Sequence, residues 1–272
     1  MIKILVAGLP GHMAATFSKH ALKEKEIDVI NFSITGANTE IEKFDIEGRM
    51  FCLIKANDKE GIDKLFEQNK PTIVVDYTEP HAAEKNIELY CRKKVHFVMG
   101  TTGVASSRFS DQIKDSNISA VIAPNMGKQI VAFQAMLEYV ANHFPNSFTG
   151  YTLTIRESHQ KGKLDTSGTA RAMVGYFKKL GIKFEESDII TYREPEEQIK
   201  LGVPREHLSG HGWHTYSLTS ADESVHFEIT HNVNGRDIYA KGTIDSIFYL
   251  NKKIKQGIKG RIFSMADVLT DS

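Results

Sequence analysis

The residue types best suited to chemistry lie close together in the polar stretch Arg156–Ala170. His159 can give or take a proton near neutral pH, and Lys163 adds a full positive charge. The stretch closes on Thr166–Thr169, with the sequence Thr-Ser-Gly-Thr. Small hydroxyl residues and glycine at a helix start leave backbone N–H groups that, with the helix dipole, bind an anion. The stretch therefore predicts proton transfer at a bound anion, although such a loop, taken alone, is more often an ordinary helix cap with a solvated basic surface.

The neighbouring elements would hold this stretch between a strand and a helix. Tyr151–Ile155 has the pattern of a strand, and Thr169–Leu180 has the pattern of a helix. The predicted anion site then lies at the N-terminus of this helix, shortly after Lys163 in the chain.

The N-terminal segment predicts a second site of a different kind. Ile2–Ala7 is apolar without alternation, as in a strand buried on both faces, and a helix pattern follows it to about Lys25. The junction carries Gly8, Gly11 and Ala14 in the pattern Gly-x-x-Gly-x-x-Ala. A tight glycine turn between a strand and a helix brings the helix N-terminus to a dinucleotide pyrophosphate. This favours a dinucleotide site, with a purely structural turn as the alternative.

The end of the next predicted strand, Ile27–Ser33, bears on which dinucleotide is bound. Folds that bind NAD usually carry Asp or Glu there, which accepts hydrogen bonds from the ribose 2′-hydroxyl. This chain has Ser33 and Thr35 and no carboxylate within residues 31–36. Hydroxyl groups can donate to a 2′-phosphate that a carboxylate would repel. The sequence therefore predicts NADPH as the cofactor, with NADH possible.

Further along, short apolar strands alternate with amphipathic helices, which predicts a parallel sheet with crossover helices. Three of these strands end in small or polar residues, in the segments Asp76–Thr78, Gly100–Gly103 and Ala123–Met126. The carboxyl ends of parallel strands line the ligand crevice of a doubly wound sheet. The residues thereby assigned to the cofactor site are Tyr77, Thr78, Gly100, Thr102, Ala123, Pro124, Asn125 and Met126.

From about residue 127 the pattern changes. A long helix is predicted over Gly127–His143, and alternating apolar and polar residues later predict an antiparallel meander. The strands of this meander are predicted at Asp188–Arg193, Gly212–Leu218, Ser224–Asn232 and Asp237–Ala240, with a last helix at Thr243–Lys255. The sequence thus predicts an α/β protein with a Rossmann-type dinucleotide-binding domain (1–126 and 241–272) and an α+β domain (127–240) for substrate binding and oligomerisation.

Composition and charge exclude several classes of protein. Lys+Arg and Asp+Glu both number 34, so no net field would recruit nucleic acid or an anionic membrane. The two cysteines lack Cys-x-x-Cys spacing, which argues against a disulfide framework or a zinc site. No apolar run is long enough to span a bilayer, and the N-terminus does not resemble a signal peptide. We therefore expect a cytoplasmic protein that binds neither nucleic acid nor membrane.

The pair His211 and His214 suggests a metal site at first inspection. On a strand, however, residues three apart point to opposite faces, and no cysteine or acidic residue lies at a useful spacing. We therefore expect no metal, and we expect His214, His226 and His231 to be sheet histidines rather than catalytic ones.

Taken together, these motifs resemble those of the 4-hydroxy-tetrahydrodipicolinate (dihydrodipicolinate) reductases over nearly the full length of the chain. The shared segments are Gly8–Met13, Asp76–Thr78, Gly100–Gly103, Ala123–Met126, Glu157–Ala170 and Ile229–His231, with Arg236 and Tyr239–Gly242. Met126–Gln129 and Ser209–His211 are similar to the plant-like branch. The resemblance implies a Rossmann-type domain, a substrate domain with an open mixed sheet, and a homo-oligomer, usually a tetramer, built through those sheets.

The resemblance also implies a reaction in the diaminopimelate route to lysine. Hydride from NADPH or NADH would reduce a small cyclic imine with two carboxylates, and a positioned acid would protonate the adjacent carbon. His159 and Lys163 would be the catalytic residues, and either could deliver the proton. The substrate would be bound by Gln160, Ser167, Gly168 and Thr169. Most bacterial members have a second histidine where this chain has Gln160, so a carboxylate contact can persist here without a protonatable group.

For the cofactor, the implied residues are Gly8, Gly11 and Met13 at the pyrophosphate, and Gly100, Thr102 and Ala123–Met126 at the nicotinamide. His12 stands where family members usually have Arg or Lys. A neutral histidine would hold a phosphate more weakly than either, so we expect the preference for NADPH to be modest.

Two other functions stay open. A different two-domain NADP oxidoreductase, such as a homoserine or aspartate dehydrogenase, would share the first domain but lacks the Ser-Gly-Thr-Ala run. A non-catalytic dinucleotide-binding sensor would keep the glycines and need neither His159 nor Lys163. The presence of all these features in one chain favours the reductase.

Overall fold

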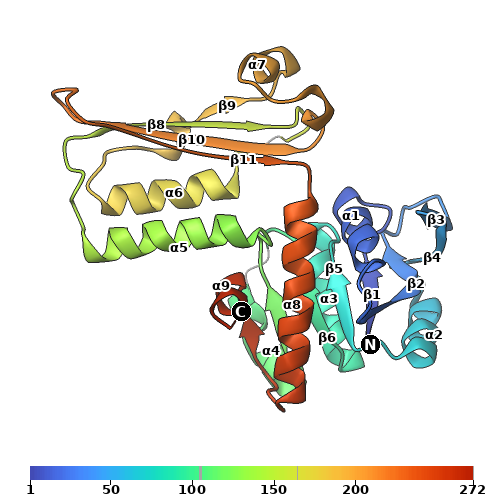
Figure 1. Ribbon diagram of the computed structural model, residues 1–272. Coiled ribbons are helices and arrows are strands. Elements are labelled where there is room, and N and C mark those ends of the chain that lie inside the picture. The colour runs from blue at the N-terminus through green and yellow to red at the C-terminus, as the bar shows by residue number, and fades with distance from the viewer. Residues whose placement is uncertain (104–105, 164, 272) are drawn as a thin grey trace. The chain divides into compact units, whose positions relative to one another are not determined.

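Two compact units make up the computed structural model, which describes residues 1–103, 106–163 and 165–271. Unit 1 comprises Met1–Val131 with Asp237–Ser272, and unit 2 comprises Ala132–Arg236. The chain therefore leaves unit 1 once and returns to it for its last helices (Figure 1).

Unit 1 is built on an eight-stranded sheet in the order β12-β7-β6-β5-β1-β2-β4-β3. Its strands are β1 (Ile2–Ala7), β2 (Ile27–Thr35), β3 (Lys43–Ile46), β4 (Arg49–Lys55), β5 (Ile73–Asp76), β6 (His96–Met99), β7 (Ala120–Ile122) and β12 (Ile262–Phe263). In the described part of this sheet, only β3 runs antiparallel to its neighbour. The chain winds outward from β1 in both directions, so the strand order reverses between β1 and β5.

Helices cover both faces of this sheet. They are α1 (His12–Ala21), α2 (Lys59–Asn69), α3 (Pro80–Lys93), α4 (Ser110–Asp115), α8 (Asp237–Lys255) and α9 (Met265–Thr270), with a 3₁₀ turn at Ser106–Phe109. Alternate residues of β1 belong to separate cores. Ile4 and Val6 pack with α1 and α8, whereas Leu5 and Ala7 pack with α2 and α3. Burial on both faces explains why β1 is apolar without alternation.

Unit 2 consists of a four-stranded sheet in the order β11-β10-β8-β9. Its elements are β8 (Thr152–His159), α6 (Gly168–Lys179), β9 (Ile190–Tyr192), α7 (Pro195–Lys200), β10 (His211–Thr219) and β11 (His226–Asn234), with 3₁₀ turns at Glu186–Asp188 and Arg205–His207. The helix α5 (Lys128–His143) leads into this unit. α5 and α6 lie against one face of the sheet (Figure 1), where Ile155, Phe177 and Tyr216 belong to a shared core.

The structure confirms the α/β class, the parallel Rossmann-type sheet and the open mixed sheet, and it corrects two details. Asp237–Ala240, predicted as a strand, is the first turn of α8. The pattern of these residues fits either element, but Ala240 and Ile244 are buried one helical turn apart. The predicted antiparallel meander is wrong for β9, because α6 forms a crossover connection that brings β9 parallel to β8.

Candidate functional site

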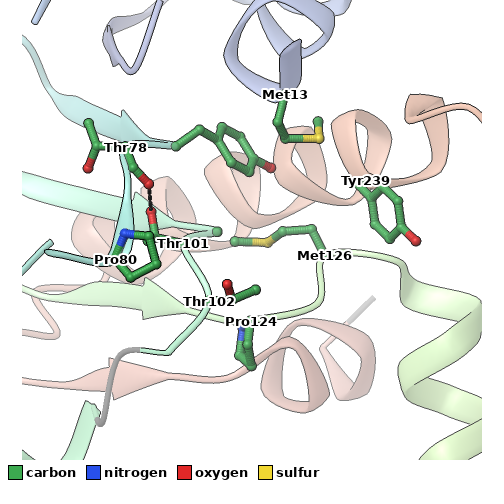
Figure 2. Close-up of a pocket in the computed structure, with 10 residues that line it drawn as sticks. Met13, Thr78, Pro80, Thr101, Thr102, Pro124, Met126 and Tyr239 are labelled. Carbon is green, nitrogen blue, oxygen red and sulfur yellow. Dashed lines mark hydrogen bonds between the residues drawn. The ribbon is translucent and has the colours of Figure 1, made fainter. Parts of the chain in front are cut away.

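The loops that follow β5, β6 and β7 meet around a pocket of about 270 Å³ in unit 1 (Figure 2). Its lining consists of Met13, Tyr77, Thr78, Pro80, Gly100, Thr101, Thr102, Pro124, Met126 and Tyr239. Sequence reasoning assigned these residues to a cofactor site, except for Pro80, Thr101 and Tyr239. The pocket lies where the strand order reverses, which is where open α/β sheets bind their ligands.

The turn after β1 approaches the neighbouring loop closely. Gly8 has a φ of +115°, and a Cβ there would lie 2.6 Å from the carbonyl oxygen of Tyr77, so a larger residue would displace the turn. Gly11 donates its N–H to the Gly8 carbonyl at 2.8 Å and is the N-cap of α1, with His12 exposed directly after it. Within the described residues no side chain caps α1. The first N–H groups of the helix are therefore open to an anion such as a pyrophosphate.

A buried carboxylate fixes the segment after β5. Asp76 is fully buried, and its Oδ1 accepts from the N–H and the hydroxyl of Thr78 at 2.8 and 2.7 Å. Its Oδ2 accepts from the Asn86 amide at 2.9 Å and from the Tyr90 hydroxyl at 2.6 Å. From the β6 side, the Thr101 hydroxyl donates to the Thr78 carbonyl at 3.0 Å (Figure 2). The loop that carries Thr78 is thereby held from both sides.

Tyr77 forms a wall of the pocket. Its ring lies against Gly100, where a Cβ would collide with it, and its hydroxyl is hydrogen-bonded to the Thr243 hydroxyl of α8. Burial raises the pKa of the Tyr77 phenol well above its usual value, against the smaller opposing effect of the Thr243 hydrogen bond. Tyr77 is therefore a neutral, fixed surface and not an acid or a base.

The structure does not place Ser33 and Thr35 in the pocket lining. Both are buried; the Ser33 hydroxyl accepts from the Leu9 N–H at 3.3 Å, and the Thr35 hydroxyl is 2.8 Å from the Thr39 hydroxyl. Ser33 thus supports the turn after β1. The direct phosphate contact predicted for these two hydroxyls does not fit their burial, and the half-buried Thr39 is the hydroxyl nearer the surface.

The loop after β7 combines a strand end with a helix start. Ala123 is buried and donates its N–H to the Met99 carbonyl at 3.0 Å. Asn125 Oδ1 accepts from the Gly127 N–H at 2.8 Å, directly before α5. The residues that reach the pocket are Pro124 and Met126, whereas Ala123 and Asn125 shape the loop that carries them.

In unit 2 the charged residues cluster at the end of β8. His159 Nδ1 lies 2.5 Å from Glu157 Oε2, and the Arg193 guanidinium donates to Glu157 Oε1 at 2.6 Å. Burial alone raises the pKa of the Glu157 carboxyl, but the hydrogen bonds and charges of His159 and Arg193 outweigh it and hold the pKa at about 2. Glu157 is therefore a carboxylate that orients the imidazole, which leaves Nε2 as the nitrogen for proton transfer.

Lys163 lies in the loop between β8 and α6. Its ammonium is 2.7 Å from Asp165 Oδ1, and its hydrogen bond and charge lower the pKa of that carboxyl. Arg193 donates from Nε to the Lys163 carbonyl at 3.0 Å and from Nη2 to the Asp165 carbonyl at 3.3 Å. The guanidinium that pairs with Glu157 therefore also holds the backbone from which Lys163 extends. Gln160, directly after β8, is half-buried.

The N-terminus of α6 adjoins this cluster. Ser167 donates its N–H to Glu157 Oε1 at 3.3 Å, and its hydroxyl lies 3.0 Å from His214 Nε2 and does not cap the helix. Among the residues that the structure describes, the N–H groups of Gly168 and Thr169 have no hydrogen-bond acceptor. These two groups are therefore open to an anion.

Sequence reasoning missed Glu157, Arg193 and His214 as members of this cluster. The ring of His214, buried in β10, has its centroid 5.1 Å from that of His159 and 4.6 Å from that of His231. Burial lowers the pKa of His214 and lowers that of His231 to about 4, so both are neutral near pH 7. The sequence carried one signal for Glu157. It precedes His159 by two residues, and residues two apart on a strand point to the same face of the sheet.

Potential metal-ligating atoms of Glu157, His159 and His214 lie within 4.8 Å of one another. Two features favour an ion pair of Glu157 with His159 over a metal. Arg193 already contacts Glu157 Oε1, and the 2.5 Å between Glu157 Oε2 and His159 Nδ1 is shorter than the ~3.3 Å expected between two ligands of a tetrahedral zinc. The expected absence of a metal stays a prediction.

Comparison with known protein families gives matches over most of the chain. Residues 2–126 match the model "Dihydrodipicolinate reductase, N-terminus", and residues 129–269 match "Dihydrodipicolinate reductase, C-terminus". The two matches meet at the start of α5. In the described residues no helix is long and apolar enough to cross a membrane.

Individual proteins give the same result. The chain is 42% identical to 4-hydroxy-tetrahydrodipicolinate reductase 1, chloroplastic, of Arabidopsis thaliana, over 99% of this chain and 78% of the relative. It is 27% identical to the 4-hydroxy-tetrahydrodipicolinate reductase of Methanothermobacter thermautotrophicus, over 99% of both. The dipicolinate-bound dihydrodipicolinate reductase from Paenisporosarcina sp. TG-14 has the same fold, with a TM-score of 0.67 at 17% identity over 97% of each chain.

Proposed function

The chain belongs to the dihydrodipicolinate reductase family, and we propose that it reduces 4-hydroxy-tetrahydrodipicolinate to tetrahydrodipicolinate with NADPH or NADH, in the diaminopimelate route to lysine. The observation that carries the proposal is the His159–Glu157 pair beside the N-terminus of α6. It puts a proton donor next to open N–H groups. A reductase of an anionic imine needs both, and a nucleotide sensor needs neither.

The substrate is a small ring with two carboxylates, so its site must supply positive charge and N–H donors. The Lys163 ammonium and the N–H groups of Gly168 and Thr169 suit one carboxylate, and the Gln160 amide can donate to the other. The present partner of Lys163 is Asp165, whose side chain is 63% exposed. An ion pair with such an exposed carboxylate is worth little, so Lys163 can exchange it for a substrate carboxylate.

His159 is the proton donor in this proposal, with Lys163 as the alternative. The Glu157 carboxylate lies 2.5 Å from Nδ1 as the ion-pair partner of the imidazole, and it thereby directs Nε2 to the substrate carbon. When bound, the cofactor supplies the hydride. Substrate, hydride and proton together give the product and water, because the ring hydroxyl leaves as water. Glu157 then keeps the neutral imidazole in the tautomer that can take a new proton on Nε2.

NADPH is the proposed preferred cofactor, with NADH as a possible second. The turn formed by Gly8 and Gly11 at the N-terminus of α1 fits a pyrophosphate. The end of β2 has no carboxylate, so nothing there would repel a 2′-phosphate. Residues 31–42 also contain no arginine to clamp the phosphate, so the preference for NADPH should be modest. Steady-state kinetics with each cofactor tests this, and a preference for NADH of about tenfold or more would contradict it.

A homo-oligomer, with a tetramer as the expected size, completes the proposal. The face of the unit 2 sheet opposite α5 and α6 presents Arg156, Trp213, Thr215 and Thr230 around a pocket of about 160 Å³. A second copy of this chain is the occupant that the family resemblance implies. Light scattering after size exclusion measures the mass.

The proposed location is the cytoplasm, whereas the plant relatives carry "chloroplastic" in their names. Fluorescence of the tagged chain in its source cells separates the two compartments.

Turnover of enzymatically generated substrate, followed by the loss of reduced-nicotinamide absorbance, tests the function directly. We expect steady turnover with NADPH. Cofactor binding without turnover would favour a sensor. Turnover with aspartate or homoserine as the substrate would favour a different dehydrogenase.

A further inference from the structure

We propose that Arg193 is a positioning residue for both catalytic candidates, His159 and Lys163. It acts on His159 through the Glu157 carboxylate and on Lys163 through the backbone of the loop after β8. The inference rests on the proposed function, because that function gives His159 and Lys163 their catalytic roles.

The contact with Glu157 keeps a buried charge in place. The Glu157 side chain is 0% exposed, and a buried carboxylate is stable only when it is paired and hydrogen-bonded. Arg193 Nη2 supplies that pairing at 2.6 Å on Oε1, which leaves Oε2 for His159 Nδ1 at 2.5 Å. Without the guanidinium, Glu157 would have to take up a proton or turn away, and in both cases the imidazole loses its anionic partner.

The contacts with the loop fix the starting point of the Lys163 side chain. Arg193 Nε donates to the Lys163 carbonyl at 3.0 Å, and Nη2 donates to the Asp165 carbonyl at 3.3 Å. A guanidinium presents its donors in a rigid plane and can serve a carboxylate and two carbonyls at once. An ammonium is a compact charge without that fork, so lysine would keep the charge but lose the geometry.

Strand pairing brings Arg193 to this place. In the parallel pairing of β8 with β9, Tyr192 is opposite Ser158, so Arg193 leaves the sheet beside His159. The fully buried Gln198 joins the two strand ends, because its amide donates to the His159 carbonyl at 2.7 Å and to the Tyr192 carbonyl at 3.2 Å. The position of Arg193 relative to His159 is therefore fixed by the sheet and by α7.

Charged and titratable groups surround His159 on each neighbouring strand: Glu157 on β8, Arg193 after β9, His211 and His214 on β10, and His231 on β11. Burial lowers the pKa of the last three, so they are neutral near pH 7. Glu157 is then the anion of this set, and its carboxylate lies between His159 and Arg193. Its removal would leave His159 facing the positive Arg193 without an anionic partner.

Two variants, Arg193→Lys and Glu157→Gln, test the proposal. Arg205→Lys is the matched control, because Arg205 is an exposed arginine of the same unit. We expect Arg193→Lys to lower kcat by about 10- to 100-fold and to raise KM for the substrate, since the Lys163 loop shifts. We expect Glu157→Gln to lower kcat and to remove the preference for a proton on Nδ1 of His159, read from the ¹⁵N chemical shifts of the ring. Cofactor affinity and the control should match the wild type.

Folded variants that keep the wild-type kcat and the wild-type ¹⁵N shifts of the His159 ring would overturn the proposal, and so would a lowered Tm with unchanged shifts. If Glu157→Gln does not fold, ¹⁵N chemical shifts of the His159 ring in the wild type and in Arg193→Lys replace it. We expect a proton on Nδ1 in the wild type and a loss of that preference in the variant; a wild-type Nε2–H tautomer contradicts the pairing. An inactive wild type would refute the proposed function, while these shifts would still test the role of Arg193.

Discussion

The two candidate sites offer different groups to a ligand: backbone N–H groups in unit 1 and charged side chains in unit 2. In unit 1 none of the described residues that line the pocket is charged, and the adjoining turn offers N–H groups beside glycines. In unit 2 the site is a network of ionised side chains around His159. Backbone and shape are enough to hold a dinucleotide, whereas proton transfer needs a group whose charge changes. We therefore expect substitutions in unit 1 to act on cofactor affinity and substitutions in unit 2 to act on turnover.

The largest effect is expected for His159→Gln. Loss of the general acid should lower kcat by roughly 10²–10⁴-fold, while cofactor affinity, which we propose depends on unit 1, stays the same. Steady-state kinetics and a fluorescence titration of the cofactor measure the two quantities. His226→Gln, an exposed histidine on β11, is the control. A collapse of cofactor binding would show that the comparison between the units is wrong.

Lys163→Ala should lower turnover by about two orders of magnitude, because it removes a charge-assisted contact used in binding and in chemistry. Stability should change little, since the Asp165 carboxylate that Lys163 contacts is largely exposed. The matched control is Lys161→Ala, which removes the same charge from the same loop, where Lys161 pairs with the exposed Glu194. Unchanged turnover at saturating substrate would exclude the role of Lys163.

Acid should weaken the charge network of unit 2 and so lower the free energy of unfolding. Glu157 has a pKa of about 2 when folded against an ordinary 4.5, so its contribution to the free energy of unfolding is full above about pH 4.5 and lost as the pH falls to about 2. The loss amounts to ~3 kcal/mol, or roughly a hundredfold in the unfolding equilibrium.

Urea unfolding at about pH 5 and about pH 3 measures this contribution, and Glu157→Gln should flatten the difference. Asp222→Asn is the control, because Asp222 also has a pKa of about 2 but is fully exposed, where water screens its interactions. His231 has a pKa lowered to about 4, so the unfolded chain takes up a proton there before the folded chain does. It therefore lowers the free energy of unfolding earlier, as the pH falls from about 6.5 to about 4. Equal acid sensitivity of the wild type and Glu157→Gln would place the titrating groups elsewhere.

Gly8→Ala tests the other side of the comparison. The positive φ alone costs ~1–2 kcal/mol for a residue with a Cβ, and the contact with the Tyr77 carbonyl forces the turn to move. We expect the cofactor Kd to rise by about tenfold while kcat at saturating cofactor stays near the wild type. Gly48→Ala separates the two causes, because Gly48 has a φ of +85° and nothing within 4 Å of an added Cβ. Equal cofactor affinity in both variants would refute the close fit at Gly8.

The smallest effect is expected for Gln160→His, which restores the residue usual in bacterial members. Both side chains can donate a hydrogen bond to a carboxylate, so activity should stay within about tenfold of the wild type. Kinetics with the substrate varied is the measurement. A folded but inactive variant would mean that the pocket is shaped around the amide.

Local patterns were enough to predict much of the fold. The apolar run of β1, the glycine turn after it and the small residues at the ends of β5, β6 and β7 identified the sheet and the edge at which its pocket lies. Buried parallel strands and helix starts leave these signals in consecutive residues, where no distant contact is needed to interpret them. The Ser-Gly-Thr helix start of α6 was found in the same way.

Other features depended on which segments pair. Asp237–Ala240 fits a strand or a helix until Ala240 is packed in the core of unit 1. Ser33 has a hydroxyl suited to a phosphate, but Ser33 is buried under the turn after β1. Its hydroxyl there accepts a hydrogen bond from the Leu9 N–H. In both cases the local pattern allowed two outcomes, and the packing of distant residues selected one.

The sequence by itself determined that Lys163 lies between a strand and a helix start, because those signals are local. The strand does not end at Ile155 as predicted but continues to His159, which is its last residue. Only the tertiary structure decided what surrounds Lys163 and His159. Arg193 is far from Glu157 in the chain and comes to its carboxylate because β9 pairs with β8 in parallel, in a register that places Tyr192 opposite Ser158. That register is set by burial across the whole sheet, and no pattern within the β9 segment encodes it.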